Sequence, residues 1–389
     1  MGRRKGKNSP KRLLLCALAA ALLLSLIPGA GAAGAAEVCL SSQTLKVNGR
    51  QVRCTAYNID GSNYFRLRDL AALLTDTGSR FGGDYDEATQ AVLIATGEAY
   101  VPPEGEPEAE EDLSGTARPT RQRIFVDGEE QTELSVWNIG GEEGSNYFKL
   151  RELGELLGFW VNYDEESRTV LVRSRFEPGM ARLGETEDAG REYLDRIVFL
   201  GDSTTYGIGW YYRHGYPDLC PPAQIWTPSN GTMTLAYYES ARILFPATGE
   251  KLPIADCARK ARPDILIVTL GTNGLSLLDE AGFREKYRSL VLEVREASPN
   301  TEIIINSIYP VADSWEGQSY INNKKIDAAN LWAEAAAEEL GCRFLYSHEA
   351  LEADGRLPEN RQNGDGLHLN GEAFGQVMAY IRTHALPEA

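Results

Sequence analysis

The sequence is short of basic residues. Its 39 Lys and Arg stand against 56 Asp and Glu, giving a net charge of −17 over 389 residues. A negative field of this size repels nucleic acids at long range, so we expect no nucleic-acid partner. The hydrophobic content of 43% and the charged content of 24% are otherwise ordinary for a globular protein. The length predicts two or three domains.

Long apolar runs are equally scarce, apart from one at the amino terminus. A start rich in Lys and Arg precedes an apolar run from Leu13 to Ile27, and small residues follow Pro28. This layout is typical of a secretory signal peptide, which we assign to residues 1–36. The run is short for a membrane span, which needs about 20 residues. An uncleaved anchor is the alternative, and a membrane is a partner only in that case. We therefore predict a secreted or cell-envelope protein of bacterial type.

Cysteine is infrequent, and its spacing fits no metal site. Cys39 and Cys54 flank one short segment and could form a disulfide bond in an oxidising compartment. Cys220, Cys257 and Cys342 are scattered, and we expect them to be buried thiols. The sequence thus predicts no metal and no cofactor.

An internal repeat is the clearest feature of the amino-terminal half. The Ser-Asn-Tyr-Phe-x-Leu-Arg element of the first copy starts at Ser62 and returns at Ser145. Each copy is predicted to open with a strand and turn (45–49 and 124–128), to continue into a Leu-rich helix, and to end in a β-rich run (91–94 and 169–172). We place the copies at 37–97 and 122–174. A Pro-, Glu- and Gly-rich linker at 98–121 separates them, and a second joint spans 175–194.

The repeat unit resembles the small β-α-β modules related to the copper amine oxidase N-terminal domain. The resemblance rests on the Asn-Ile, Ser-Asn-Tyr-Phe-x-Leu-Arg and Tyr-Asp elements, and it implies attachment to the cell wall. It does not imply copper chemistry, because neither copy contains a histidine. Four aromatic residues of the repeats are expected to fill the module cores, with direct ligand contact as the alternative: Tyr64, Phe65, Tyr147 and Phe148.

The carboxy-terminal part, residues 195–389, alternates apolar strands with helical segments. Four β-rich runs occur at 196–200, 264–270, 302–308 and 343–346, and their near-continuous apolar character indicates a parallel sheet buried on both faces. Segments 283–297 and 326–340 have helical spacing. The predicted fold class is α/β, a three-layer α/β/α sandwich preceded by the two small modules.

Three polar motifs follow this α/β pattern. Gly201-Asp202-Ser203 comes directly after the first strand, Gly271-Thr272-Asn273 after the second, and Asp365-Gly366-Leu367-His368 lies near the end of the chain. Ligands of such sheets gather at the carboxyl ends of the strands. Alone, Ser203 reads as a helix cap and His368 as a structural histidine. Together the motifs supply a hydroxyl, an amide donor and an imidazole with a carboxylate beside it.

In this order the motifs resemble those of the SGNH (or GDSL) hydrolases, across nearly all of the carboxy-terminal half. The resemblance implies a flavodoxin-like fold, with Ser203 as nucleophile, His368 as base and Asp365 orienting His368. It also implies an oxyanion hole formed by the Ser203 N–H, the Asn273 side chain and the Gly231 N–H. The glycine motif is the ambiguous one, and Gly231 is our choice for it. Thr204 stands where the family usually has leucine.

An aromatic-rich segment from Tyr206 to Tyr238 follows the nucleophile motif. Aromatic faces suit sugar rings and acyl chains, so we predict Trp226 and Tyr206 as substrate-binding residues. The alternative is that most of these rings pack against the sheet.

The expected function is that of a secreted serine esterase. It would hydrolyse a small acyl ester, an acetyl ester by preference, on a cell-envelope or other polysaccharide. Its partner is then an acylated carbohydrate or another small ester. A polysaccharide O-acyltransferase with the same triad and a non-catalytic cell-surface binding protein are the alternatives.

Overall fold

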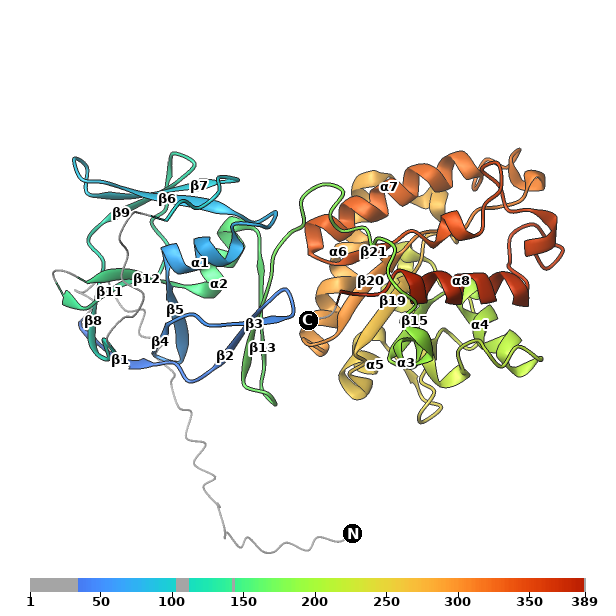
Figure 1. Cartoon of the computed structure of the whole chain (residues 1–389), viewed down its shortest axis with the longest axis horizontal. Helices are drawn as coiled ribbons and strands as arrows, with labels where there is room; N and C mark the ends of the chain where they lie inside the picture. The colour runs from blue at the N-terminus through green and yellow to red at the C-terminus, as the bar shows by residue number, and fades with distance from the viewer. Residues whose placement is uncertain (1–33, 103–111, 142–143, 388–389) are drawn as a thin grey trace, which may run out of the picture. The chain divides into compact units, whose positions relative to one another are not determined.

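The computed structural model describes residues 34–102, 112–141 and 144–387, and it contains a strand-rich amino-terminal region and a carboxy-terminal α/β domain (Figure 1). Nearly all of the predicted signal peptide, including Cys16, and the middle of the 98–121 linker lie outside the described residues. None of the described helices combines the length and the apolar character needed to cross a lipid bilayer.

The amino-terminal region contains a closed six-stranded barrel. In spatial order its strands are β1 (Ala36–Leu40), β4 (Ala56–Ile59), β5 (Ser62–Arg66), β12 (Ser145–Lys149), β11 (Val136–Ile139) and β8 (Gly115–Pro119). The copies of the repeat meet where β5 pairs with β12, with Phe65 opposite Phe148. Tyr64, Phe65, Tyr147 and Phe148 are all buried, which confirms their expected place in the core.

Two four-stranded sheets flank the barrel, and each contains strands of both copies. One has the order β10 (Glu129–Glu130), β9 (Arg123–Val126), β7 (Ala91–Thr96) and β6 (Phe81–Asp86). The other has the order β13 (Trp160–Asp164), β14 (Thr169–Arg173), β2 (Thr44–Val47) and β3 (Arg50–Val52). In each sheet the closing hairpin of one copy pairs in parallel with the opening hairpin of the other. Helices α1 (Leu67–Leu74) and α2 (Leu150–Leu157) pack into a single core drawn from both copies.

This topology differs from the expected pair of separate β-α-β modules. Each copy contributes more strands than that unit has, and the two copies share all three sheets. Segment 115–119 also differs from the prediction, since it forms β8 within the barrel and not a solvated linker. A unit of this size is only marginally stable as an independent core, and pairing between the copies enlarges the core and covers exposed strand edges.

The carboxy-terminal domain contains a five-stranded parallel sheet, as the apolar runs predicted. Its spatial order is β16 (Ile225–Trp226), β15 (Ile197–Gly201), β19 (Ile265–Thr269), β20 (Glu302–Asn306) and β21 (Arg343–Leu345). Every neighbouring pair in it is parallel. Counted along the chain, this is the 2-1-3-4-5 order of flavodoxin-like folds, whose ligand crevice lies at the carboxyl ends of the first and third strands.

Helices cover both faces of this sheet, so the predicted three-layer sandwich is confirmed (Figure 1). One layer contains α5 (Ile254–Ala261), α6 (Glu280–Ala297) and α7 (Asn323–Leu340), and the other contains α3 (Gly190–Asp195), α4 (Ser203–Arg213) and α8 (Gly371–Thr383). Alternate residues of β19 enter the two cores: Leu266 and Val268 face one layer, Ile265 and Ile267 the other. A short hairpin, β17 (Ile243–Leu244) and β18 (Lys251–Leu252), lies outside this sheet.

The five described cysteines are all free thiols. The disulfide bond that Cys39 and Cys54 could have formed is absent from the structure, with Cys39 exposed on β1. Cys220, Cys257 and Cys342 are buried, as expected. Among the described residues, no group of three or more His, Cys, Asp or Glu side chains could hold a metal ion.

Candidate active site

Ser203 lies at the tight turn between β15 and α4, where it is the first residue of the helix. Asp202 caps this helix, because its Oδ1 accepts hydrogen bonds from the Thr204 backbone N–H at 3.0 Å and from the Thr204 hydroxyl at 2.8 Å. Gly201 allows the close packing, since a Cβ there would collide with the Thr205 hydroxyl and lie 2.6 Å from the Thr269 carbonyl oxygen. The N–H groups of a first helical turn have no acceptor within the helix, so the Ser203 N–H is placed to bind an anion.

A hydrogen-bonded chain connects Ser203 to His368 and Asp365. The Ser203 Oγ lies 2.8 Å from His368 Nε2, although the two residues are 165 positions apart in the sequence. The other ring nitrogen, Nδ1, lies 2.7 Å from Asp365 Oδ2. The structure thus brings together the three residues to which the sequence assigned nucleophile, base and orienting carboxylate.

The Asp365 carboxylate is held by its own loop. Its Oδ1 accepts the backbone N–H groups of Leu367 and His368, each at 2.8 Å. Partial burial would raise the pKa of Asp365, but the hydrogen bonds from His368 and Leu367 outweigh it and hold that pKa below its usual value. Asp365 therefore stays ionised and holds the His368 ring with Nε2 facing the serine.

Asn273 lies beside the nucleophile turn, at the end of the neighbouring strand. Its Nδ2 donates to Asp202 Oδ2 and to the Met233 carbonyl, both at 3.2 Å. Asp202 is only 1% exposed, and burial raises its pKa against the hydrogen bonds that it accepts from Thr204. Since both amide hydrogens of Asn273 already have acceptors, donation to a substrate oxyanion requires one of these long contacts to open.

Gly231 also lies against the nucleophile turn. Its φ is +69°, and a Cβ there would lie 3.5 Å from the Ser203 Cα and 3.2 Å from the Tyr206 Cβ. Its backbone N–H, however, donates to the Pro228 carbonyl at 2.8 Å. Gly231 therefore lies beside Ser203, as predicted. Its backbone N–H, the expected oxyanion donor, is already hydrogen-bonded within a local turn.

The two predicted substrate-binding residues have different environments. Tyr206 is 36% exposed on α4, one helical turn after Ser203, and lines a cavity of about 290 Å³. Trp226 is 1% exposed, and its ring packs near Phe245 in the core. The prediction for Trp226 is wrong because β16 pairs with β15 at Leu200, which directs the indole into the sheet-facing core.

Sequence reasoning missed Trp315, which supports the loop of Asp365 from outside. Its Nε1–H donates to the Asp365 carbonyl oxygen at 2.8 Å. No motif marks this residue, because the contact joins two loops that are 50 positions apart. Each of the other three histidines has a contact elsewhere: His214 stacks on Trp210, His384 stacks on Tyr380, and the buried His348 lies near the Ile308 carbonyl.

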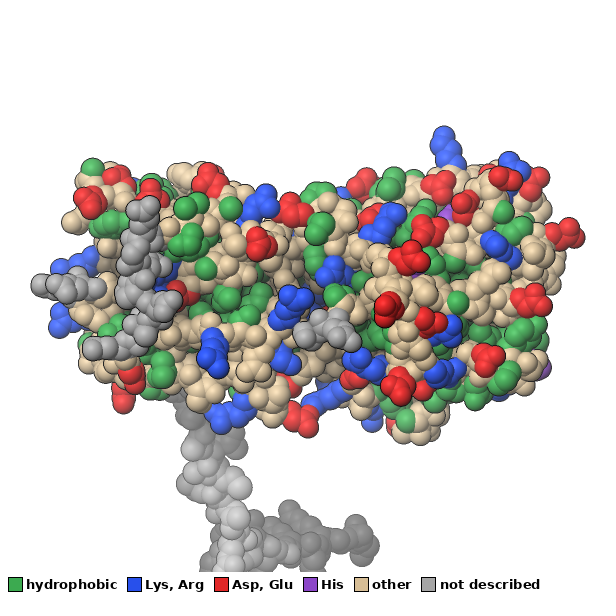
Figure 2. All heavy atoms as spheres, in the orientation of Figure 1, with side chains coloured by type: hydrophobic (Ala, Val, Ile, Leu, Met, Phe, Trp, Pro, Cys, Tyr) green, Lys and Arg blue, Asp and Glu red, His purple; other side chains and the backbone are tan. Residues whose placement is uncertain are grey.

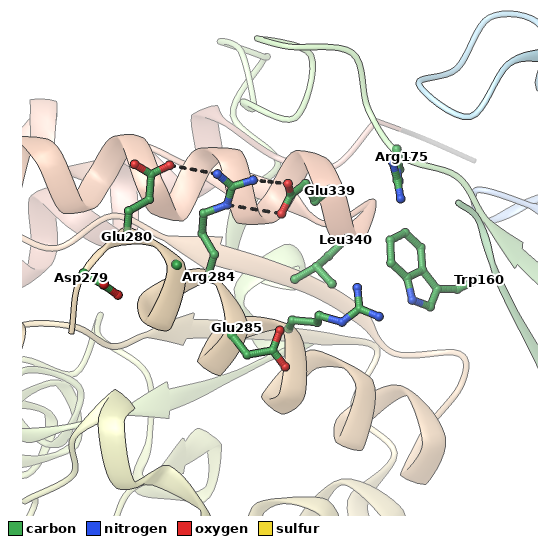
Figure 3. Close-up of a pocket in the computed structure, with 10 residues that line it drawn as sticks. Trp160, Arg175, Asp279, Glu280, Arg284, Glu285, Glu339 and Leu340 are labelled. Carbon is green, nitrogen blue, oxygen red and sulfur yellow. Dashed lines mark hydrogen bonds and ion pairs between the residues drawn. The ribbon is translucent and has the colours of Figure 1, made fainter. Parts of the chain in front are cut away.

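A larger cavity of about 670 Å³ contains none of the predicted site residues (Figure 3). Charged side chains of α6 and α7 line it, and Arg284 pairs there with Glu280 and Glu339. Arg284 is thus the lining residue whose charge is paired within the cavity. Figure 2 shows acidic and basic side chains interspersed over the face drawn, so the described residues form no continuous basic patch on that face.

Comparison with known families identifies the carboxy-terminal part. Residues 199–374 match the family described as GDSL-like Lipase/Acylhydrolase. This part of the chain is a GDSL-like lipase/acylhydrolase domain. The match begins within β15 and ends within α8, so it includes Ser203, Asn273 and His368. The comparisons do not support the resemblance of the amino-terminal repeats to copper amine oxidase modules.

Solved structures similar to the chain include a GDSL-like lipase from Bacteroides thetaiotaomicron, with 18% identity, a TM-score of 0.34, and coverage of 48% of this chain and 85% of that one. A lipopolysaccharide acetyltransferase periplasmic domain from Salmonella Paratyphi A has 12% identity, a TM-score of 0.33, and coverage of 52% and 90%. A carbohydrate esterase family 3 protein from Talaromyces cellulolyticus has 15% identity, a TM-score of 0.33, and coverage of 48% and 93%. No curated protein sequence matches the chain. These values do not identify a substrate.

Proposed function

We propose that the GDSL-like domain is a serine esterase that hydrolyses a small acyl ester, an acetyl ester by preference. The observation that carries this proposal is the alignment of Ser203 Oγ, the His368 ring and the Asp365 carboxylate at successive distances of 2.8 and 2.7 Å. A base within hydrogen-bond reach of a hydroxyl, and itself oriented by a carboxylate, is the arrangement that activates a serine. The family match supports an esterase-type enzyme.

The reaction follows from these positions. Ser203 Oγ bonds to the acyl carbon while His368 Nε2 takes the hydroxyl proton. When the tetrahedral intermediate collapses, the ester C–O bond breaks and His368 gives its proton to the leaving alcohol. Water then attacks the acyl-enzyme, again losing a proton to His368, and the free acid leaves as that proton returns to Ser203.

Charge that develops on the carbonyl oxygen needs hydrogen-bond donors. The Ser203 N–H at the start of α4 is one donor of the proposed oxyanion hole, and the Asn273 amide becomes a second when its contact with the Met233 carbonyl opens. The Gly231 N–H becomes a third only if its turn with Pro228 opens.

The proposed substrate is an acylated carbohydrate of the cell envelope or of another polysaccharide. The predicted signal peptide and the repeat region beside the enzyme domain favour a polymer outside the cell over a small cytoplasmic ester. Exposed Tyr206 beside Ser203 offers a ring face to a sugar.

Acetate release tests this function. The purified chain is expected to release acetate from p-nitrophenyl acetate and from acetylated xylan or peptidoglycan, and Ser203→Ala and His368→Ala are expected to abolish release. Ser289→Ala, at a partly exposed position of α6, serves as the control. Appearance of an acylated glycan product in place of free acetate would favour the acyltransferase alternative, and a chain inactive on all these esters would contradict both.

A further inference from the structure

The proposed triad loop belongs to neither helix nor strand. Residues 363–368 connect a short turn, Glu359–Arg361, to the start of α8, and they carry both Asp365 and His368. The Asp365 side chain is 44% exposed and the His368 side chain 32% exposed, so solvent reaches both. Exposed loops are mobile unless other elements hold them. The 2.7 Å contact between these two side chains therefore needs external support.

Two backbone positions of this loop are held by one neighbouring segment, residues 312–315. The Trp315 Nε1–H donates to the Asp365 carbonyl at 2.8 Å, and the Ala312 N–H donates to the Gly366 carbonyl at 2.8 Å. Apart from the contact between Ser203 and His368, the remaining bonds described for the loop are local, such as that from the Asn363 N–H to the His368 carbonyl. Only the 312–315 segment fixes Asp365 from outside its own loop among the hydrogen bonds of the described residues.

The indole ring of Trp315 also fits the shape of the loop. Gly366 has a φ of +77°, and a Cβ there would lie 3.0 Å from both Cδ1 and Nε1 of Trp315. The ring therefore lies directly against the Gly366 backbone, where no larger residue fits. The Tyr320 ring packs edge-on against the indole, with the two ring centroids 6.0 Å apart.

The segment that carries Trp315 is itself attached to a long helix. Asn323, the first residue of α7, is 5% exposed and forms two hydrogen bonds of 2.9 Å with the backbone of Val311. The Ala312 carbonyl then accepts the Trp315 N–H at 2.9 Å. A continuous series of hydrogen bonds thus connects α7 to the Asp365 backbone.

We propose that Trp315 is a positioning residue for the esterase reaction. Its N–H and ring hold the Asp365–Gly366 backbone so that the carboxylate meets His368 Nδ1, although Trp315 itself contacts neither Ser203 nor the reacting ester. This inference rests on the proposed function only for its kinetic consequence. The geometric consequence, a preserved Asp365–His368 hydrogen bond, is independent of any substrate.

The test uses Trp315→Phe, which keeps an aromatic ring and deletes the donor. On p-nitrophenyl acetate we expect kcat to fall about tenfold with KM unchanged, since small displacements of catalytic groups cost one to two orders of magnitude. Trp332→Phe is the matched control. Trp332 is a partly buried residue of α7 that packs on Phe283, it forms none of the hydrogen bonds described for the Asp365 loop, and its replacement is expected to leave kcat unchanged.

A double-mutant cycle separates positioning from a general loss of structure. If Trp315 acts through Asp365, Trp315→Phe causes no further loss of kcat in an Asp365→Ala background. An equal loss of kcat in both backgrounds, or an unchanged kcat in the single variant, would overturn the proposal.

Proton NMR tests the same contact without a substrate. The Nδ1–H of His368 is expected to give a low-field resonance in the wild-type chain that weakens or shifts upfield in Trp315→Phe and is retained in Trp332→Phe. An unchanged resonance in Trp315→Phe would also overturn the positioning role. A chain that hydrolyses no ester but shows this resonance change would refute the proposed function alone.

Discussion

The side-chain amide of Asn273 donates to the buried carboxylate of Asp202 at 3.2 Å, although the two residues are 71 positions apart. Asp202 is also the cap of α4, so one carboxylate fixes both the helix that begins with Ser203 and the orientation of the Asn273 amide. The same Nδ2 donates to the backbone carbonyl of Met233, which can only accept a hydrogen bond. The N–H side of Asn273 is therefore the side that turns toward the nucleophile turn.

Replacement of Asn273 tests this arrangement. Asn273→Ala removes the proposed oxyanion donor and is expected to lower kcat by about 10² to 10³ with little change in KM, as for other single donors. Steady-state kinetics on p-nitrophenyl acetate measure both constants. A kcat within about threefold of the wild-type value would remove Asn273 from the oxyanion hole.

The pH dependence of stability tests the state of Asp365. Its folded pKa lies below the usual value, so the ionised carboxylate stabilises the fold above the unfolded pKa, and this contribution is lost as pH falls through the folded pKa. Asp365→Asn should thus be less stable than wild type near neutral pH, with the difference vanishing in acid. Urea unfolding of both proteins, from neutral pH to below pH 3.9, measures this difference in the free energy of unfolding. A difference that did not change with pH would contradict the ionised state assigned to Asp365.

Trp226 and Tyr206 are predicted to differ in what their replacement changes. Trp226→Phe removes volume from the core and should lower the free energy of unfolding by about 1–3 kcal/mol while leaving KM unchanged. Tyr206→Ala alters an exposed side chain beside Ser203 and should raise KM for a polymeric substrate while stability changes little. Thermal unfolding and kinetics on acetylated xylan distinguish the two variants. If Trp226→Phe raised KM and Tyr206→Ala lowered stability instead, Trp226 would be the substrate-binding residue of the two.

The shared sheets predict that the two repeats fold together. A fragment of residues 37–97 contains strands whose partners belong to the second copy, so it should lack stable structure by circular dichroism. A fragment of residues 35–174 contains the whole barrel and should unfold in one cooperative transition. Independent folding of the shorter fragment would show that the copies are separate modules after all.

Much of the enzyme domain could be predicted because its signals are local. Apolar runs such as 264–270 are long enough to identify buried parallel strands, and the motifs of Ser203 and Asn273 come soon after their strands. Strand β16 has only two residues and leaves no recognisable pattern, so the environment of Trp226 was misjudged. The hydrogen bonds of Gly231 and Trp315 depend on loop conformation, which residue type alone does not specify.

In the repeat region, the elements could be predicted from the sequence but their pairing could not. Its strands and helices were located from periodicity, but two copies of one sequence offer each strand two equivalent partners. One edge of β7 pairs with β6 of its own copy, and the other edge could accept the opening strand of either copy. Its pairing with β9 of the second copy depends on the tertiary closure of the barrel and on the single core around α1 and α2. Local propensity carries no information on that choice.

In the proposed mechanism, His368 activates Ser203 for attack on an ester. Mass spectrometry after treatment with a fluorophosphonate tests it most directly, because the reagent bonds only to an activated serine hydroxyl. One modified peptide, containing Ser203, is expected in the wild-type chain, and no such adduct is expected in His368→Ala. Equal labelling of Ser203 in both proteins, or labelling of a different serine, would contradict it.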